Sequence, residues 1–90
     1  MNDREIFILS GFIEIGSRRQ AVFNVLSSDD VKIPKRIAED SGVKIGHVSN
    51  TLREFKEKGL AECINENDHK GRLYRLTPLG NEVKQYLEKR

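Results

Sequence analysis

The 90-residue sequence has few of the features that mark secreted, membrane or metal-binding proteins. Its single cysteine, Cys63, excludes an internal disulfide and leaves no cysteine cluster for a metal. No apolar run approaches the ~20 residues that span a bilayer. The N-terminus also lacks the basic flank, apolar segment and cleavage site of a secretion signal. We therefore expect a cytoplasmic protein with no metal, no cofactor and no membrane contact.

Enzymatic motifs are lacking as well. The serines have no histidine with an acidic partner at a spacing typical of a catalytic triad. Gly11 and Gly16 are isolated and do not form a phosphate-binding loop. Neither His47 nor His69 combines with Cys63 in a spacing known for zinc. We do not expect an enzyme.

Repeats, low-complexity tracts and linkers are absent, and ninety residues suffice for one domain rather than two. Hydrophobic residues make up only 37% of the chain but are well spaced. This pattern predicts a small core without a deep ligand cavity. The expected organisation is a single domain over residues 1–90, with an apolar segment at 1–15, a central unit at 17–77 and a C-terminal helix at 78–90.

The segment from Arg4 to Ile15 is densely apolar. Its apolar residues cover two neighbouring helical faces, which predicts a helix buried on more than one side. A strand is the alternative, because β-branched and aromatic residues dominate and Gly11 weakens a helix.

A second helix is predicted to begin at Ser17. Ser17 and Gln20 match a capping box, in which the two side chains satisfy exposed backbone donors at a helix start. Arg18 and Arg19 lie just inside this start, where positive charge opposes the helix dipole. That unfavourable placement hints at contact with phosphate.

Two further helices follow, separated by a glycine. Pro34 suits the first position of one helix, which Gly42 ends. The next helix is predicted from about Ile45 to Lys58, with a buried stripe of Val48, Leu52 and Phe55, and with Gly59 as its stop.

Two strands and a last helix complete the chain. Residues 60–65 and 72–77 are predicted strands joined by the polar loop 66–71, and residues 31–33 are a candidate third strand. Thr77 and Pro78 then form an N-cap and first turn. The order predicts a mostly α fold with a small β-hairpin wing, a winged helix-turn-helix.

The charge is uneven, although the net charge is only +2. Residues 1–30 carry a net −2, residues 31–60 a net +3 and residues 61–90 a net +1. The excess positive charge lies over the helix-turn-helix, where it would attract phosphates.

The sequence resembles winged-helix transcription regulators of the MarR and ArsR type. The residues that carry the resemblance, over about residues 16–80, are Gly16-Ser17-Arg18-Arg19, Ile37-Ala38-Glu39-Asp40-Ser41-Gly42-Val43, Val48-Ser49-Asn50-Thr51-Leu52-Arg53-Glu54-Phe55-Lys56-Glu57-Lys58-Gly59-Leu60 and Arg72-Leu73-Tyr74-Arg75-Leu76-Thr77-Pro78-Leu79-Gly80. It departs at Lys44, where the family often has a capping Ser or Thr, and at Gly46, which lacks a side chain for base contact.

The resemblance implies that the helix from Ile45 is a recognition helix. Its outward residues would meet base edges, the preceding helix would hold phosphates and the wing would follow the flanking backbone. The candidate DNA-binding residues are Lys32, Lys35, Arg36, Lys44, His47, Ser49, Asn50, Arg53, Lys70 and Arg72. The alternative for Arg53 is an ion pair with Glu57, and Glu66 and Asp68 oppose phosphate contact by the wing.

We therefore expect a DNA-binding transcriptional regulator, with helix 45–58 in the major groove and the wing at 61–77 on the backbone of double-stranded DNA. A homodimer through residues 6–15 and the C-terminal helix is expected, because that apolar surface needs a cover. The alternative is a winged helix used for protein contact, without sequence-specific DNA binding.

Overall fold

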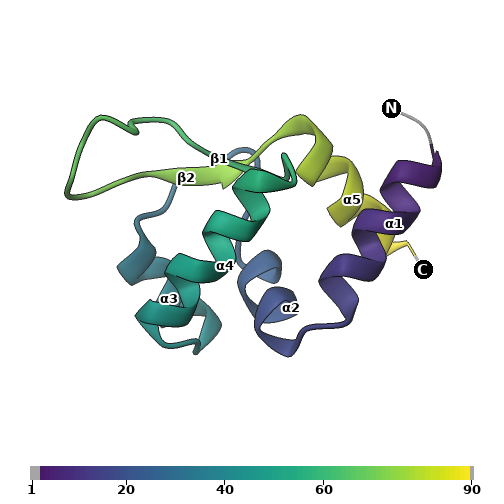
Figure 1. Cartoon of the computed structure of the whole chain (residues 1–90), viewed down its shortest axis with the longest axis horizontal. Coiled ribbons are helices and arrows are strands. Elements are labelled where there is room, and N and C mark those ends of the chain that lie inside the picture. Colours follow the sequence, from purple (N-terminus) through teal and green to yellow (C-terminus); the bar gives the residue numbers. More distant parts are fainter. Residues whose placement is uncertain (1–2, 90) are drawn as a thin grey trace.

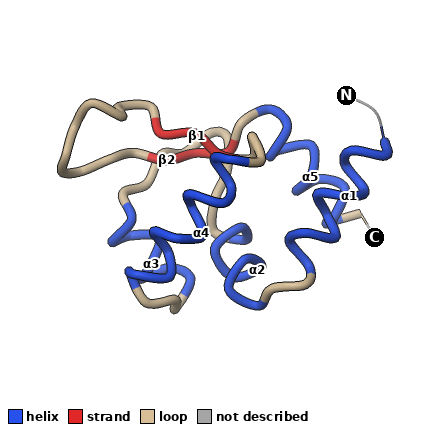
Figure 2. Tube along the Cα trace, viewed as in Figure 1, coloured by secondary structure: helices blue, strands red, loops and turns tan. Residues whose placement is uncertain are grey.

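The computed structural model describes residues 3–89 as five helices and a two-stranded antiparallel hairpin (Figures 1 and 2). This confirms the predicted mostly α fold with a β-hairpin wing. The ends of the predicted domain at residues 1, 2 and 90 lie outside the described residues. In chain order the elements are α1 (Asp3–Glu14), α2 (Ser17–Asn24), α3 (Pro34–Ser41), α4 (Ile45–Glu57), β1 (Ala61–Cys63), β2 (Tyr74–Leu76) and α5 (Pro78–Glu88).

The N-terminal apolar segment is a helix, α1, so the alternative of a strand was wrong. Leu9 and Ile13 on one face are buried, and the face packs against α5 and α2. The opposite face, with Phe7, Ile8 and Ile15, is exposed. Gly11 is tolerated because tertiary packing of Leu9 and Ile13 outweighs its propensity cost of about 1 kcal/mol.

The capping box predicted at the start of α2 was wrong. Ser17 is the first helical residue, and the N-cap is Gly16, which has no side chain to cap with. Gln20 does not reach back to the helix start. Its Nε2 donates instead to the carbonyl oxygen of Glu14 at the end of α1 (2.6 Å). This bond joins the two helices across their short connection.

The α3–α4 pair forms the predicted helix-turn-helix. Pro34 occupies the first turn of α3, and Gly42 ends it in the left-handed conformation (φ 74°), which glycine adopts without a steric penalty. Val48, Leu52 and Phe55 of α4 are fully buried, as the stripe predicted. Gly59 (φ 75°) then turns the chain out of α4 into the hairpin.

The strands are shorter than predicted. β1 and β2 pair over three residues each, with Ala61 opposite Leu76 and Cys63 opposite Tyr74. The predicted third strand is a single bridge, in which Lys32 and Tyr74 exchange both backbone hydrogen bonds. The rest of the hairpin is a long loop. The Ile64 N–H still donates to the Leu73 carbonyl (2.9 Å), but the Leu73 N–H and the Gly71 carbonyl bond to the side chain of Asn65 rather than to a facing strand.

One core joins all five helices and the hairpin. Phe23 of α2 and Phe55 of α4 meet edge to face at its centre, with ring centroids 5.7 Å apart. The chain then closes through α5, where Thr77 accepts a hydrogen bond from the Gly80 N–H, as the predicted N-cap. The buried hydrophobic residues are Leu9, Ile13, Val22, Phe23, Leu26, Ile37, Val48, Leu52, Phe55, Leu60, Ala61, Tyr74, Leu76 and Val83.

The molecule is elongated, with extents of 36 × 24 × 20 Å. The hairpin and α3 lie at one end of the long axis, and α1 and α5 lie side by side at the other (Figure 1). In residues 3–89 no helix combines the length and the apolar character needed to cross a bilayer.

Candidate nucleic-acid interface

Helix α4 presents a polar face to solvent. Ser49, Asn50 and Arg53 are exposed, while the opposite side of the helix is in the core. The predicted Arg53–Glu57 ion pair does not form, and Arg53 has no ion pair within residues 3–89. Gly46, near the helix start, faces open space. The outward side of α4 is therefore free of covering chain and carries hydrogen-bonding groups.

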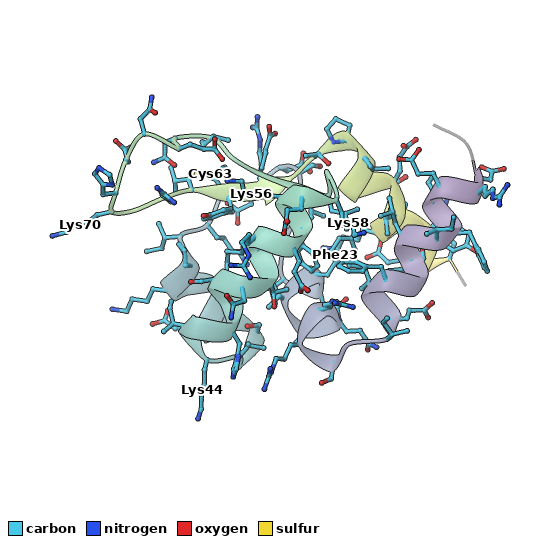
Figure 3. The ribbon with its side chains drawn as sticks, in the orientation of Figure 1. Phe23, Lys44, Lys56, Lys58, Cys63 and Lys70 are labelled. Carbon is cyan, nitrogen blue, oxygen red and sulfur yellow. The ribbon has the colours of Figure 1, made fainter. Side chains whose placement is uncertain are left out.

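The start of α4 has no side-chain cap, as the sequence predicted from Lys44. Lys44 is the N-cap residue and has extended backbone. No side chain caps the free N–H groups in the first turn of α4. Its ammonium extends away from the body of the protein at the turn between α3 and α4 (Figure 3). The hydroxyl of Ser49 is engaged within the helix, where it donates to the Ile45 carbonyl (3.1 Å). Lys44 therefore lies at the tip of the helix-turn-helix, and the Ser49 hydroxyl proton is already in use.

A hollow of about 660 Å³ lies on one side of α4, against the start of α2. We call it the α2–α4 hollow. His47, Asn50 and Arg53 reach it from α4, and Arg18 and Arg19 from α2. Glu54 is its single acidic residue, so three arginines against one glutamate give it a net charge of +2 with His47 neutral. Three of the predicted site residues thus meet here with the two arginines of the α2 start.

A smaller hollow of about 330 Å³ lies on the other side of α4, between it and the hairpin. We call it the wing-side hollow. Ser49, Arg53 and Lys56 line it from α4, and Arg72 lines it from the hairpin. Lys56 was not among the predicted site residues. Its position seven residues after Ser49 and three after Arg53 places all three on one helical face, a signal that the sequence did contain.

Two of the predicted phosphate-binding cations, Lys32 just before α3 and Arg36 within it, contact the same carboxylate, that of Asp40. The Lys32 ammonium contacts Asp40 and the Val25 carbonyl, each at 2.8 Å, and Arg36 contacts Asp40 at 3.2 Å. The hydrogen bond from Lys32 lowers the pKa of Asp40, and Arg36 lowers it further, so the carboxylate is ionised at neutral pH. Lys32 is therefore tied into the fold. Lys35 is exposed and has no ion pair in the described residues.

The two predicted cations of the wing differ in their surroundings. Lys70 is exposed and extends from the far end of the hairpin loop (Figure 3). The Nε of Arg72 donates to the Asp68 carbonyl (2.8 Å), so its guanidinium is held beside the loop backbone. Of the two acidic residues expected to oppose phosphate, Glu66 is neutralised by Lys56 of α4. Their hydrogen bond lowers the pKa of Glu66 and raises that of Lys56, and it ties the loop to α4.

Residues 3–89 contain no cluster of histidine, cysteine and acidic side chains arranged to hold a metal ion. Cys63 is half-buried on β1, with its Sγ 3.4 Å from the Asn65 side-chain oxygen. It belongs to the hydrogen bonding of the hairpin loop.

Comparison with solved structures identifies the fold as a winged helix. The homodimeric winged helix-turn-helix DNA-binding domain of a possible ArsR-family transcriptional regulator from Mycobacterium bovis is similar over 99% of this chain and 84% of its own, with a TM-score of 0.66 and 20% identity. A MarR family regulator from Neisseria meningitidis is similar over 99% of this chain and 72% of its own, with a TM-score of 0.66 and 24% identity. The multiple antibiotic resistance repressor MarR covers 98% of this chain and 75% of its own, with a TM-score of 0.55 and 23% identity.

No protein-family model and no curated protein sequence matches the chain. The likeness is therefore one of structure, and it bears out the predicted resemblance to the MarR and ArsR type at the level of the fold.

Proposed function

We propose that this chain is a DNA-binding transcriptional regulator that acts as a homodimer, with α4 in the major groove and the hairpin wing on the flanking backbone. The observation that carries the proposal is the exposed polar face of α4, which has a basic hollow on each side. A helix that enters the major groove needs protruding hydrogen-bonding side chains, and the two DNA backbones then pass on either side of it.

Asn50 and Arg53 are the residues that we assign to base edges. They stand one turn apart on the outward face, both exposed. Asparagine can form two hydrogen bonds with adenine, and arginine can form two with guanine. Gly46 leaves the helix start without a side chain, which lets the α4 backbone approach the floor of the groove closely.

Lys35, Arg36, Lys44, Lys70 and Arg72 are the residues that we assign to phosphates. Lys35, Lys44 and Lys70 are exposed and have no ion pair within residues 3–89. Arg36 shares its charge with Asp40 but keeps 65% of its side chain exposed. Lys32 remains a candidate from the sequence, but its bonds to Asp40 and Val25 leave it the weakest one.

A homodimer would double the contact with DNA. The exposed face of α1 carries Phe7, Ile8 and Ile15, at 65%, 59% and 80% exposure. These side chains form a large apolar surface that is exposed to water in the single chain. Helix α5 lies beside α1, so both would contribute to a two-fold interface. Two α4 helices related in this way would read half-sites about 34 Å apart.

The test is binding of fluorescently labelled duplex at several salt concentrations, after selection of bound sequences from random DNA. We expect a selected site, and affinity that falls steeply with salt. Arg53→Ala should weaken binding to that site by about 10-fold or more. Lys35→Ala should lower the salt slope by about 1 for each subunit, and so by about 2 for the dimer.

The matched control is Lys89→Ala, an exposed cation at the end of α5, away from α4 and the hairpin. Because α5 belongs to the proposed dimer interface, light scattering must first show that this variant keeps the wild-type mass. It should leave the affinity for the selected site and its dependence on salt unchanged. If the wild-type chain selects no sequence and binds no duplex at low salt, the proposal fails and the winged helix is better assigned to protein contact. If Arg53→Ala and Lys35→Ala bind as the wild type does, α4 is not the groove-binding element.

A further inference from the structure

We propose that the α2–α4 hollow is a seat for a DNA backbone phosphate, with Arg18 as its principal ligand. The inference rests on the proposed function and adds to it a contact outside the helix-turn-helix and the wing. It gives α4 a phosphate contact on each side, because the wing-side hollow, which Arg72 lines, lies on the opposite flank.

Arg53 lines both hollows, and Asn50 lines the α2–α4 hollow. The hollow is thus continuous with the face of α4 that we assign to base edges. When a helix lies in the major groove, one sugar-phosphate backbone runs along each of its sides. The position of this hollow beside α4 is where the backbone on the side away from the wing would run.

The three arginines of the hollow are not equally available. Arg19 is fixed in the fold, since its guanidinium contacts Glu54 at 3.0 Å, donates to the Phe12 carbonyl at 3.1 Å and stacks over the Phe12 ring at 4.0 Å. Its hydrogen bond lowers the pKa of Glu54, which stays ionised and cancels its charge. Arg18 is exposed, borders the same hollow and has no ion pair in the described part of the chain.

Arg18 is also placed at a cost, because positive charge in the first turn of a helix opposes the helix dipole. Within residues 3–89 it has no ion pair to offset this cost. A duplex phosphate in the hollow would supply the missing negative charge, and His47 would stand beside it as a second donor.

The experiment measures the dependence of duplex affinity on salt for three single variants of the full chain. Each phosphate contact that is lost reduces the slope of log K against log salt by about 0.9, so a substitution in both subunits of the proposed dimer reduces it by about 1.8 and weakens binding by about 60-fold at 0.1 M salt. We expect this change for Arg18→Gln. We expect the opposite for Glu54→Gln, which removes the one negative charge of the hollow and should strengthen binding. Lys89→Gln, equal in charge to Arg18→Gln but distant from α4, should match the wild type.

The outcomes separate this inference from the proposed function. If the wild type binds duplex and Arg18→Gln keeps the wild-type dependence of affinity on salt, the α2–α4 hollow does not bind a phosphate through Arg18, and the proposed function stands. If the wild type does not bind duplex, the proposed function itself fails. Glu54→Gln removes the partner of Arg19, so the melting temperature of this variant must be measured. If Glu54→Gln is unfolded, the result for Arg18→Gln alone tests the phosphate contact.

A small anion is the other source of a phosphate group. Melting temperature is therefore followed with inorganic phosphate at constant ionic strength. We expect no saturable increase. A saturable increase that Arg18→Gln abolishes, together with an unchanged salt slope for DNA, would overturn the DNA seat in favour of a free anion.

Discussion

Asp40 bonds to both Lys32 and Arg36, two of the cations predicted from the sequence to bind DNA. Neither ion pair is worth much to stability, because exposed pairs contribute less than about 1 kcal/mol. Their effect is on availability. Lys32 is drawn into the fold, and Lys35, one residue before Arg36, is left as the unpaired cation of α3. The Asp40 carboxylate therefore makes Lys32 less available than Lys35 for the proposed phosphate contacts.

Gly80 illustrates a residue whose role lies in packing. A Cβ at this position would lie far inside contact distance of the Leu60 carbonyl oxygen, which accepts a hydrogen bond from the Thr77 N–H. We expect Gly80→Ala to destabilise the protein by about 3 kcal/mol, since overpacked backbone must move apart. That loss lowers the melting temperature by about 10 °C or more in a domain of this size.

The control for this prediction is Gly46→Ala, which adds the same methyl group to a helical glycine that has open space around it. It should melt within a few degrees of the wild type, because only a small gain in helix propensity is expected. Thermal unfolding followed by circular dichroism measures both. Equal melting temperatures for the two variants would contradict the close approach of α5 to Leu60.

The prediction of the capping box was wrong, and the partners of Arg19 were not foreseen, because these side chains bond to other segments of the chain. Ser17 and Gln20 have the spacing of a capping box, but Gln20 bonds to the Glu14 carbonyl across the connection between two helices. Arg19 was expected to reach phosphate, yet it holds Glu54, 35 residues away, and the ring of Phe12. Spacing within one helix carries no information on such contacts.

At the scale of elements, the side chain of Asn65 makes three hydrogen bonds within the hairpin loop, beside the Lys56–Glu66 pair that ties the loop to α4. The Asn65 side-chain oxygen accepts from the Leu73 N–H (2.7 Å), and its nitrogen donates to the Asp68 carboxylate (3.0 Å) and the Gly71 carbonyl (3.1 Å). These bonds replace the ladder that the predicted longer strands would have formed. The wing is therefore held in shape in the free protein, which would lower the entropy cost of the proposed DNA contact through Arg72.

We expect Asn65→Ala to loosen the wing while the helices stay folded. Each lost hydrogen bond costs about 1 kcal/mol, and the partly buried Leu73 N–H is left without a partner. Amide hydrogen exchange should accelerate at Leu73 and stay unchanged in α4, and duplex binding should weaken.

Asn67→Ala is the matched control, because Asn67 is an exposed residue of the same loop with no hydrogen bond in the described part of the chain. It should exchange and bind like the wild type. Unchanged exchange at Leu73 in Asn65→Ala would mean that the loop is ordered by the Lys56–Glu66 pair alone.

The whole molecule has two ends with different surfaces. The hairpin and the α3–α4 pair occupy one, and α1 with α5 occupies the other (Figure 1). Helix α1 contributes Leu9 and Ile13 to the core and keeps Phe7, Ile8 and Ile15 outside it. An assembly through the outer face of α1 would leave both α4 helices of a dimer uncovered.

We expect Ile8→Glu to separate the proposed dimer into 10.3-kDa chains that remain folded. The residue is 59% exposed, so a charge there costs little in the single chain, but it would be buried in an interface. Light scattering after size-exclusion chromatography measures the mass, and circular dichroism measures the fold.

Ile64→Glu provides the control, since Ile64 is 47% exposed but lies in the hairpin, away from α1. It should keep the wild-type mass. A wild-type chain that stays monomeric at high micromolar concentration would remove the dimer from the proposal.

The sequence by itself determined the helix-turn-helix and the order of elements, because these follow from local rules. The stripe of Val48, Leu52 and Phe55 fixed which face of α4 is buried, and Gly42 and Gly59 fixed where its neighbours turn, since both need positive φ. The polar face of α4 is what remains once the buried stripe is set.

Only the tertiary structure decided which cations are free of ion pairs and which residues line the same hollow. Arg18 of α2 and Asn50 of α4 line one hollow although 32 positions separate them in the sequence, and Lys32 is withdrawn by its bond to Asp40. The physical reason is that hydrogen bonds and ion pairs between segments depend on how helices pack, and periodicity within a helix does not encode that packing.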